Sequence, residues 1–469
     1  MKRFWLTLLL IGVLLGSMFG ATMEQKIYPV NSEPFHIITS LYITQGLALP
    51  STAGPHSGDE LMKMLDRIDA DRLAPSLKNL YQRVHDELYE EQRVATWGLE
   101  AALEAYIHTD TTNFVHAEDW VRGYDERAPF LNIILETSPG KNIYGYSELP
   151  VNYTKYSDYD ANTGTALSLF FGKSRFSTNL FFLPPGSIQE LDLAMPYRAF
   201  GAFGGENWSV QIGRDKLSWG PGKTGNFMLS DSFKYHNTGR FTTYNKNFKY
   251  SLVTSFFPHP AQYHDAIAGD DDTAIAGDDD TTIKNFLKAK DRSQAQTISG
   301  LYMFLGHRLE GRLFDGKVGL ALSESIMYQS EDNLLDLRFL NPSMLYHNYY
   351  IRSNSNSLLT FEVDYSPIPH LNVYGQLAVD EFALPGEPVP GKDADAHPSA
   401  YGFMLGVQTA IPVHKGLFTG SLEFVKTDPY LYLRYGGTGN TAQKLGEWGI
   451  NYLAAIREYY AGGNIIYQE

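Results

Sequence analysis

From about residue 94 onward, polar and apolar side chains alternate along the chain in segments of about 9–12 residues. In LTFEVDYSP (359–367), Phe361, Val363 and Tyr365 share one face of an extended strand, and polar residues occupy the other face. Further segments with this pattern lie near 96–107, 127–137, 141–153, 164–172, 174–183, 196–214, 241–257, 296–312, 316–328, 371–382, 400–411 and 417–425. This period predicts β-strands that each place one face in an apolar and the other in a polar environment.

Alternation alone fits either a soluble β-sandwich or a membrane barrel. The length of the segments favours the barrel, because a tilted membrane strand needs about 9–11 residues whereas an ordinary strand has about 5–6. No change of composition suggests a further domain after residue 93. The predicted fold class is therefore all-β: a large antiparallel transmembrane β-barrel of about 18 strands over 94–469, with a small N-terminal helical segment. A large soluble β protein is the alternative.

The N-terminus has the order of a secretory signal peptide over residues 1–22: Lys2 and Arg3, then an apolar run, then small residues. A membrane anchor is the alternative, but the apolar run is short for a membrane span. The chain has no cysteine, which excludes disulfides and thiolate chemistry. These features predict export to the outer membrane of a diderm bacterium.

Residues 23–93 are predicted to form a mainly helical periplasmic segment. Ser57 and Glu60 have capping-box spacing before an apolar stripe, and a second stripe with helical period follows Pro75. The stretch PFHIITSLYITQGL (34–47) precedes both helices and is predicted to be a strand.

The stretch SWGPGKTG (218–225) has the glycine spacing of a phosphate-binding loop. A P-loop needs a glycine at position 217, where this chain has leucine, and no parallel βαβ unit surrounds the stretch. The formal charge of −15 likewise argues against nucleic acid as a partner. We therefore expect neither nucleotide nor nucleic acid to bind, and we expect the glycines to permit a tight turn and close backbone approach. The predicted structural loop residues are Gly213, Gly220, Pro221, Gly222 and Gly225.

The stretch IGRDKLSWGPGKTGNFMLSDSF (212–233) resembles the signature of the capsule-assembly Wzi-like outer-membrane protein family. The helical segment before the barrel and RFLNP (338–342) also look similar to members of that family. The matching signature positions are Gly213, Arg214, Trp219, Gly220, Pro221, Gly222, Gly225, Leu229 and Ser230. The resemblance implies an outer-membrane barrel that acts as a lectin and holds surface polysaccharide at the cell exterior.

On this resemblance, Trp219 and nearby Tyr244 could stack on sugar faces, while charged neighbours could pair with glycan groups. The alternative is structural: Arg214 in a charge network of the lumen and Trp219 in an interfacial ring. The candidate polysaccharide-binding residues are Arg214, Asp215, Lys216, Trp219, Lys223, Ser230 and Arg338.

An exact tandem octapeptide, AIAGDDDTAIAGDDDT (266–281), is rich in aspartate. It lacks EF-hand spacing, so we expect no cofactor or metal and interpret it as a solvated loop; Ca²⁺ remains the alternative. The aspartates that could bind Ca²⁺ are Asp270, Asp272, Asp278 and Asp280. No HExxH motif or nucleophile elbow occurs. We therefore expect no catalytic residues and no enzyme activity.

The sequence thus predicts a non-catalytic outer-membrane barrel that binds and retains capsular or other surface polysaccharide and contacts outer-membrane lipid. A general or solute-specific channel and a surface adhesin are the alternatives. The last 29 residues, which end in NIIYQE, lack the terminal aromatic residue that closes most barrels, and this leaves the strand count open.

Overall fold

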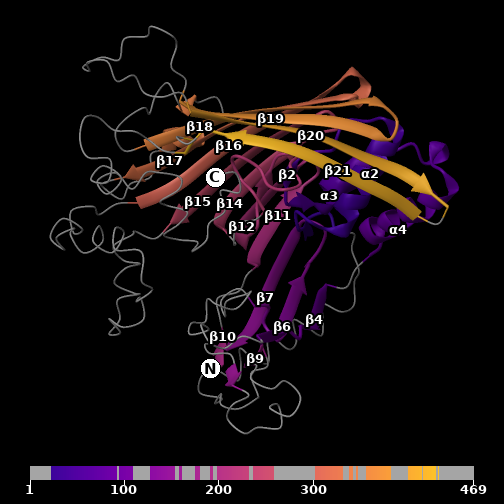
Figure 1. Cartoon of the computed structure of the whole chain (residues 1–469). Coiled ribbons are helices and arrows are strands. Elements are labelled where there is room, and N and C mark those ends of the chain that lie inside the picture. The colour runs from indigo at the N-terminus through magenta and orange to yellow at the C-terminus, as the bar shows by residue number, and fades with distance from the viewer. Residues whose placement is uncertain are drawn as a thin grey trace, which may run out of the picture. The chain divides into compact units, whose positions relative to one another are not determined.

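A computed structural model provides the structure of the chain (Figure 1). It describes residues 23–91, 94–108, 127–153, 158–160, 175–179, 191–193, 198–231, 236–257, 301–330, 337–341, 345–346, 355–381, 400–414, 416–428 and 431–432. Two compact units are present: a small unit of residues 1–21 and 92–201, and a large unit of residues 22–91 and 202–469. The predicted signal peptide, the segment 164–172 and the aspartate-rich repeat lie outside the described residues.

The large unit is built on one sheet of strands that follow one another in sequence order, from β11 to β21. From β12 onward the neighbouring strands pair antiparallel. The strands are β11 (Ala199–Gly205), β12 (Trp208–Asp215), β14 (His236–Tyr244), β15 (Phe248–Phe257), β16 (Leu301–Leu313), β17 (Val318–Ser330), β18 (Ser355–Ile368), β19 (Leu371–Glu381), β20 (Ala400–Val413) and β21 (Gly416–Thr427).

The polarity of the two faces of this sheet is the reverse of that in a soluble protein. On β18, Phe361 is 44% exposed whereas Thr360 and Glu362 are 1% and 4% exposed, and the same alternation holds along β19. Apolar side chains therefore face outward and polar side chains face inward, as the alternating sequence predicted for a membrane barrel. This inversion gives the large unit the fold of an outer-membrane β-barrel wall.

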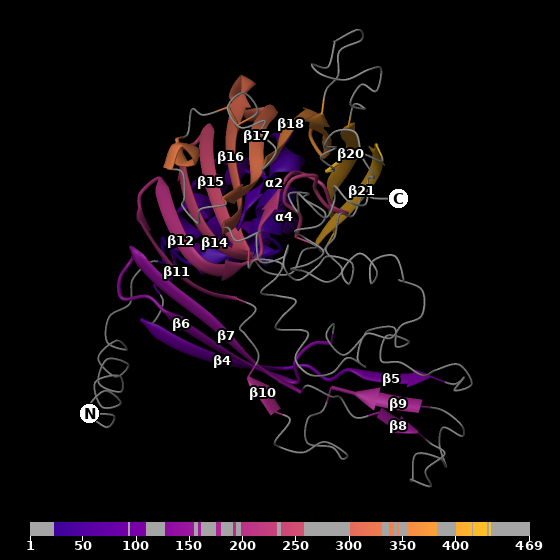
Figure 2. The same cartoon turned by 90° about the vertical axis from the view of Figure 1, so that its left-hand side faces the viewer.

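The N-terminal helices lie inside the curve of this sheet (Figure 2). They are α2 (Glu33–Gln45), α3 (Gly58–Leu65) and α4 (Pro75–Tyr89), with a 3₁₀ turn, η1 (Ala70–Arg72), between the last two. The predictions of α3 and α4 are confirmed, including Ser57 as the N-cap that accepts a hydrogen bond from the backbone N–H of Glu60. Among the described residues, no helix is both long and apolar enough to cross a bilayer.

The predicted strand over 34–47 is wrong, because this stretch forms α2. Pro34 stands in the first turn and Gly46 ends the helix in the left-handed conformation at φ 71°. Packing buries the helix on most of its faces, so its apolar residues show no helical stripe. The β-branched residues then produced a misleading strand signal.

Two predicted segments of the large unit prove to contain a bend. The segment 196–214 divides into β11 and β12 at Asn207, which has φ 70°, and 241–257 divides at the turn Asn245–Asn247. The side chain of Asn245 accepts the backbone N–H groups of Asn247 and Phe248 at 2.9 and 3.0 Å. Asparagine stabilises such turns through its side chain, and a reading based on hydrophobic period does not detect them.

The small unit contains two groups of antiparallel strands, which belong to different sheets. The first has the order β4 (Ala95–Ala101), β6 (Leu131–Thr137), β7 (Ile143–Tyr153) and β10 (Leu191–Leu193); the second has the order β5 (Ala105–His108), β9 (Arg175–Thr178) and β8 (Asp158–Asp160). The segment 96–107, predicted as one strand, is therefore divided between two sheets. Its outward apolar face is nevertheless confirmed, since Trp97 is 77% exposed. No pairing among the described residues closes the strands into a full cylinder, so closure and the count of about 18 strands stay predictions.

Candidate functional site: the occupied lumen

An extended segment, residues 47–57, crosses the lumen of the large unit between α2 and α3; we call it the lumen strap. Four of its backbone carbonyls accept hydrogen bonds from basic side chains of the sheet. Arg312 donates to Leu49 O (Nε, 2.8 Å) and Pro50 O (Nη2, 2.7 Å), Lys249 Nζ donates to Ala53 O (2.7 Å), and Arg240 Nη1 donates to Pro55 O. Charged donors form stronger hydrogen bonds than neutral ones, so these bases fix the path of the strap.

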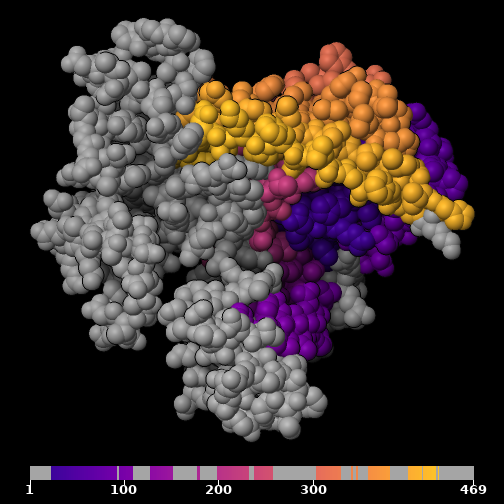
Figure 3. Space-filling view, in the orientation of Figure 1, coloured from indigo at the N-terminus to yellow at the C-terminus, as the bar shows by residue number. Residues whose placement is uncertain are grey.

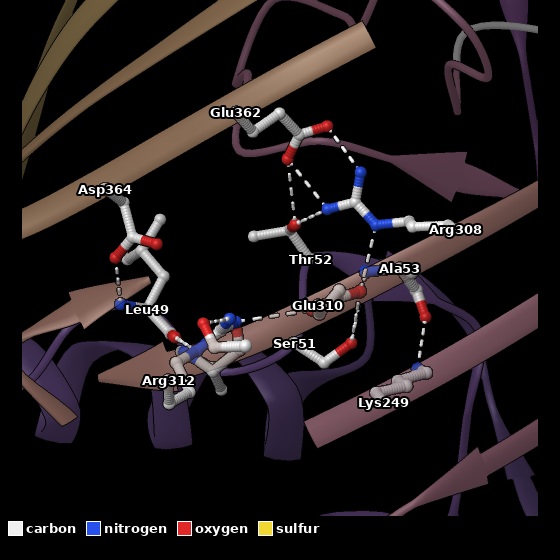
Figure 4. A network of polar contacts seen from close by, with 12 residues as sticks. Leu49, Ser51, Thr52, Ala53, Lys249, Arg308, Glu310, Arg312, Glu362 and Asp364 are labelled. Carbon is white, nitrogen blue, oxygen red and sulfur yellow. Dashed lines mark hydrogen bonds and ion pairs between the residues drawn. The ribbon is translucent and has the colours of Figure 1, made fainter. Parts of the chain in front are cut away.

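A buried arginine and two carboxylates stand at the centre of the wall behind the strap (Figure 4). Arg308 reaches Glu362 through both terminal nitrogens, at 2.5 and 2.7 Å, and Glu310 through Nε at 3.0 Å. Its Nη2 also donates to Thr52 Oγ1 of the strap at 2.5 Å. Its Nη1 donates to Ser323 Oγ at 3.0 Å as well. The guanidinium is fully buried, so protein contacts such as these stabilise its charge. The network therefore joins the strap to strands β16 and β18.

A second buried ion group lies where the strap enters α3. Glu60 accepts from Lys249 Nζ at 2.5 Å and lies 3.1 Å from His56 Nδ1. Burial alone would raise the pKa of Glu60, but the Lys249 ammonium and His56 hold it at about 2. Burial lowers the pKa of His56, which keeps this ring neutral near pH 7.

This ion group predicts acid sensitivity. The folded pKa of Glu60, about 2, lies below the ordinary value of 4.5, so its contribution to stability is present above about pH 4.5 and is lost as the pH falls toward 2. We expect the free energy of unfolding to fall by a few kcal/mol more in the wild type than in Glu60→Gln between pH 5 and pH 3. Urea unfolding in detergent at both pH values measures this difference. An equal loss of unfolding free energy in the wild type and in Glu60→Gln would contradict the low pKa assigned to Glu60.

The second segment inside the lumen is the signature loop, residues 216–231, which contains the glycine-rich stretch. It begins against the strap: β13 (Ser218–Trp219) pairs antiparallel with β2 (Ala53–Gly54), and the N–H of Gly220 donates to Thr52 O at 3.0 Å. The loop then doubles back on itself, since the N–H of Trp219 donates to Leu229 O at 2.9 Å.

The far end of the signature loop is held by the opposite wall. Glu423 on β21 accepts the N–H groups of Lys223 and Thr224 at 2.6 and 2.9 Å, and the hydroxyl of Thr224 at 2.7 Å. Tyr374 on β19 donates its hydroxyl to the same carboxylate at 2.6 Å. The loop leaves the sheet at β12 and reaches β21, so it spans the lumen.

Glycines of β12 and of the signature loop have backbone conformations or neighbours that suit glycine. Gly213, Gly220 and Gly225 have φ of 141°, 141° and 147°, which only glycine adopts readily. Gly222 is needed for space, because a Cβ there would lie 1.9 Å from the carbonyl oxygen of Gly225.

Alanine at position 222 should therefore destabilise the folded loop. We expect Gly222→Ala to cost about 1–3 kcal/mol of unfolding free energy, measured by urea unfolding in detergent. Gly416→Ala is the matched control, since nothing lies within 4 Å of a Cβ at that position. Equal stability of both variants would show that the loop is not tightly packed.

The predicted stacking of Trp219 and Tyr244 on sugar faces requires correction. Trp219 is only 1% exposed and belongs to an apolar cluster with Phe227, Phe304 and Met404. Tyr244 is 4% exposed and its hydroxyl shares a hydrogen bond with Ser57. Neither ring has a free face, because the strap and the signature loop cover the inner side of the wall.

The other candidate binding residues divide by accessibility. Asp215 and Ser230 are buried, and Asp215 accepts from Gln211 Nε2 at 2.7 Å. Arg214 is partly buried at the end of β12, whereas Arg338 is exposed on the short 3₁₀ turn η7 (Leu337–Leu340). Lys216 and Lys223 belong to the signature loop; Lys216 Nζ donates to Asp231 O at 3.3 Å and Lys223 is exposed. These residues thus lie at the end of β12 and on the signature loop that follows it, except Arg338, and few of them are accessible.

Sequence reasoning missed the residues that organise the lumen. Glu362 and Asp364 were expected to face inward, but nothing identified Arg308, Lys249 and Thr52 as partners. The available signal was weak: two arginines and a glutamate at alternate positions, 308, 310 and 312, share the inward face of one strand. Among the described residues, no cluster of histidine or carboxylate side chains could hold a metal ion.

These observations define a class: an outer-membrane-type β-barrel wall whose lumen is occupied by its own N-terminal segment and an inward-folded loop. Figure 3 shows the indigo N-terminal segment filling the space bordered by the yellow strand β21. The polar lining of the wall thus contacts protein.

The comparisons with known proteins agree with this class at the level of fold. No family model and no curated protein sequence matches the chain. Among solved structures, the chain resembles Wzi from Escherichia coli, described as an outer-membrane protein involved in group 1 capsule assembly and a carbohydrate-binding β-barrel. The TM-score is 0.51 at 12% identity, over 87% of this chain and 75% of Wzi. The expected resemblance to Wzi-like barrels is therefore confirmed as a shared fold.

The structure of the chain also resembles, more weakly, that of an anion-selective porin from Comamonas acidovorans. It has a TM-score of 0.30 at 12% identity, over 71% of this chain and 79% of the porin. A TM-score this low does not indicate a shared fold.

Proposed function

We propose that this protein is a non-catalytic outer-membrane barrel that binds and retains capsular or other surface polysaccharide. The observation that carries the proposal is the occupied lumen: buried charges attach the strap to one wall, and the Glu423 carboxylate attaches the signature loop to the opposite wall. This arrangement is suited to a rigid binding scaffold and unsuited to an open channel. The fold shared with a carbohydrate-binding barrel supports the choice of ligand.

The connections between strands support an orientation. Turns between β14 and β15, β16 and β17, β18 and β19, and β20 and β21 have two to four residues, whereas 258–300, 331–354 and 382–399 connect strands at the other end. Short turns are typical of the periplasmic end of such barrels and long loops of the extracellular end. The long connections are therefore the part of the chain proposed to hold glycan outside the cell.

The helices lie at the short-turn end, which supports a periplasmic position for the segment 23–93. The backbone N–H of His370, in the turn after β18, donates to Ile43 O of α2 at 2.7 Å. The N–H of Ala48 likewise donates to Gly316 O, in the turn after β16, at 2.8 Å. The segment would then close the lumen from the periplasmic side.

A glycan array on the detergent-solubilised protein tests the function. We expect retention of polysaccharide, and we expect it to survive Trp219→Phe, because Trp219 packs in the core and does not contact glycan. Arg338→Gln tests the exposed member of the candidate set and should weaken retention, with Arg72→Gln as an exposed control. No retention of any glycan would refute the proposal.

A further inference from the structure

A small cavity of about 50 Å³ opens at the short-turn end of the large unit. Buried residues Ser51, Glu60, Lys249 and Glu310 line its inner part. More accessible residues line its entrance: Lys63 of α3, Arg67 just after that helix, and Asn245, Lys246 and Asn247 of the β14–β15 turn. Its volume suits a carboxylate or phosphate group with a neighbouring hydroxyl, so only one end of a sugar ligand enters it.

The charges in the inner part are already paired. Lys249 meets Glu60 at 2.5 Å, and Arg312 meets Glu310 at 3.3 Å. At the entrance, Lys63 is paired with Asp59 at 2.6 Å.

Arg67 and Lys246 are different, because no carboxylate of the described residues lies within ion-pair distance of either one. Arg67 Nη1 instead donates to the backbone carbonyl oxygen of Lys246 at 2.8 Å and to Asn247 Oδ1 at 3.2 Å, which fixes the guanidinium against the β14–β15 turn that carries Lys246. Two cationic residues outside the ion pairs of the described residues thus line one entrance on a chain whose net charge is −15, and an anion would be attracted to this place.

The inner part offers a hydrogen-bond acceptor rather than another cation. Glu60 Oε2 is buried and has no hydrogen-bond partner in the structure, although a buried carboxylate oxygen ordinarily has one. Ser51 Oγ and the oxygens of Glu310 are already engaged with one another and with Arg308. A ligand that satisfies the whole cavity therefore carries an anionic group at one end and a hydroxyl donor at the other.

We infer that this cavity is a binding site for an acidic sugar unit, which enters from the short-turn end. The carboxylate lies at Arg67 and Lys246, and a ring hydroxyl donates toward Glu60. The site is separate from the extracellular loops; it rests on the proposed function only in the choice of a glycan as the source of the anion.

Ligand-observed NMR on the folded, detergent-solubilised full chain tests the inference, with glucuronate and trigalacturonate as probes. Binding of both is expected, while glucose and maltotriose, which lack the carboxylate, should bind at least tenfold more weakly. The double variant Arg67→Gln/Lys246→Gln should lose at least tenfold in affinity for the acidic probes. Lys317→Gln is the matched control, because Lys317 is an exposed lysine of the neighbouring β16–β17 turn and does not line the cavity.

Three outcomes would overturn the inference: equal binding of neutral and acidic probes, unchanged affinity in the double variant, or an equal loss in Lys317→Gln. Competition with inorganic phosphate is a further test. If phosphate at equal concentration displaces glucuronate completely, the site takes oxyanions in general and the sugar assignment fails. Retention of long polysaccharide plays no part in this titration, so failure of the proposed function and failure of this site are distinguishable.

Discussion

Replacing Arg308 by methionine is expected to reduce the free energy of unfolding by about 3–5 kcal/mol, because it removes the partner of two buried carboxylates. Glu362 would lose both of its bonds to the guanidinium, and Glu310 would keep Arg312 as its charged partner and Ser51 as a hydrogen-bond donor. Thr52 of the strap would lose its donor as well. Urea unfolding in detergent micelles, followed by far-UV circular dichroism, gives the measurement.

Two controls separate the network from a general effect of the substitution. Arg72→Met changes an exposed arginine of η1 and should stay within about 0.5 kcal/mol of the wild type. The double variant Arg308→Met/Glu362→Gln removes an uncompensated charge and should recover part of the lost stability. If the double variant is no more stable than Arg308→Met, the pair does not act as a unit.

The second large effect concerns conductance. Deleting residues 23–91 removes the helices and the strap while keeping the predicted signal peptide, and it should convert a protein that is silent in planar bilayers into one that gives discrete conductance steps. Most inward side chains of strands such as β18 are polar, so water can replace much of the deleted segment along the wall.

A milder variant covers the case in which the deletion does not fold. Arg240→Gln, Lys249→Gln and Arg312→Gln together remove the basic donors to the strap carbonyls, and this triple variant should open transiently. Lys317→Gln, at the same end, should stay silent. Heat-modifiable migration on a gel verifies that each variant is folded. Conductance in the wild type itself would favour the channel alternative.

The orientation of the side chains could be predicted from the sequence because the pleat of a strand is a local property. Phe361, Glu362 and Val363 point to alternate faces wherever the strand lies, so a list of residues suffices to assign the faces. The same local reasoning identified the capping box of α3 and the need for glycine in the signature loop. It failed at α2, where burial on most faces removes the helical period.

The sequence by itself thus determined the two-faced wall and the glycine-dependent turn of this protein. Only the tertiary structure decided what occupies the lumen, because the contacts concerned join residues far apart in the chain: Thr52 and Arg308 are 256 positions apart, and Leu49 and Asp364 are 315 apart. No pattern of neighbouring residues encodes such pairs, since each inward polar side chain could equally well face water. The burial of Trp219 also depends on a contact between distant residues. A tryptophan beside glycines is equally compatible with an exposed sugar-binding surface, and only the packing of the strap against Trp219 shows that it is buried.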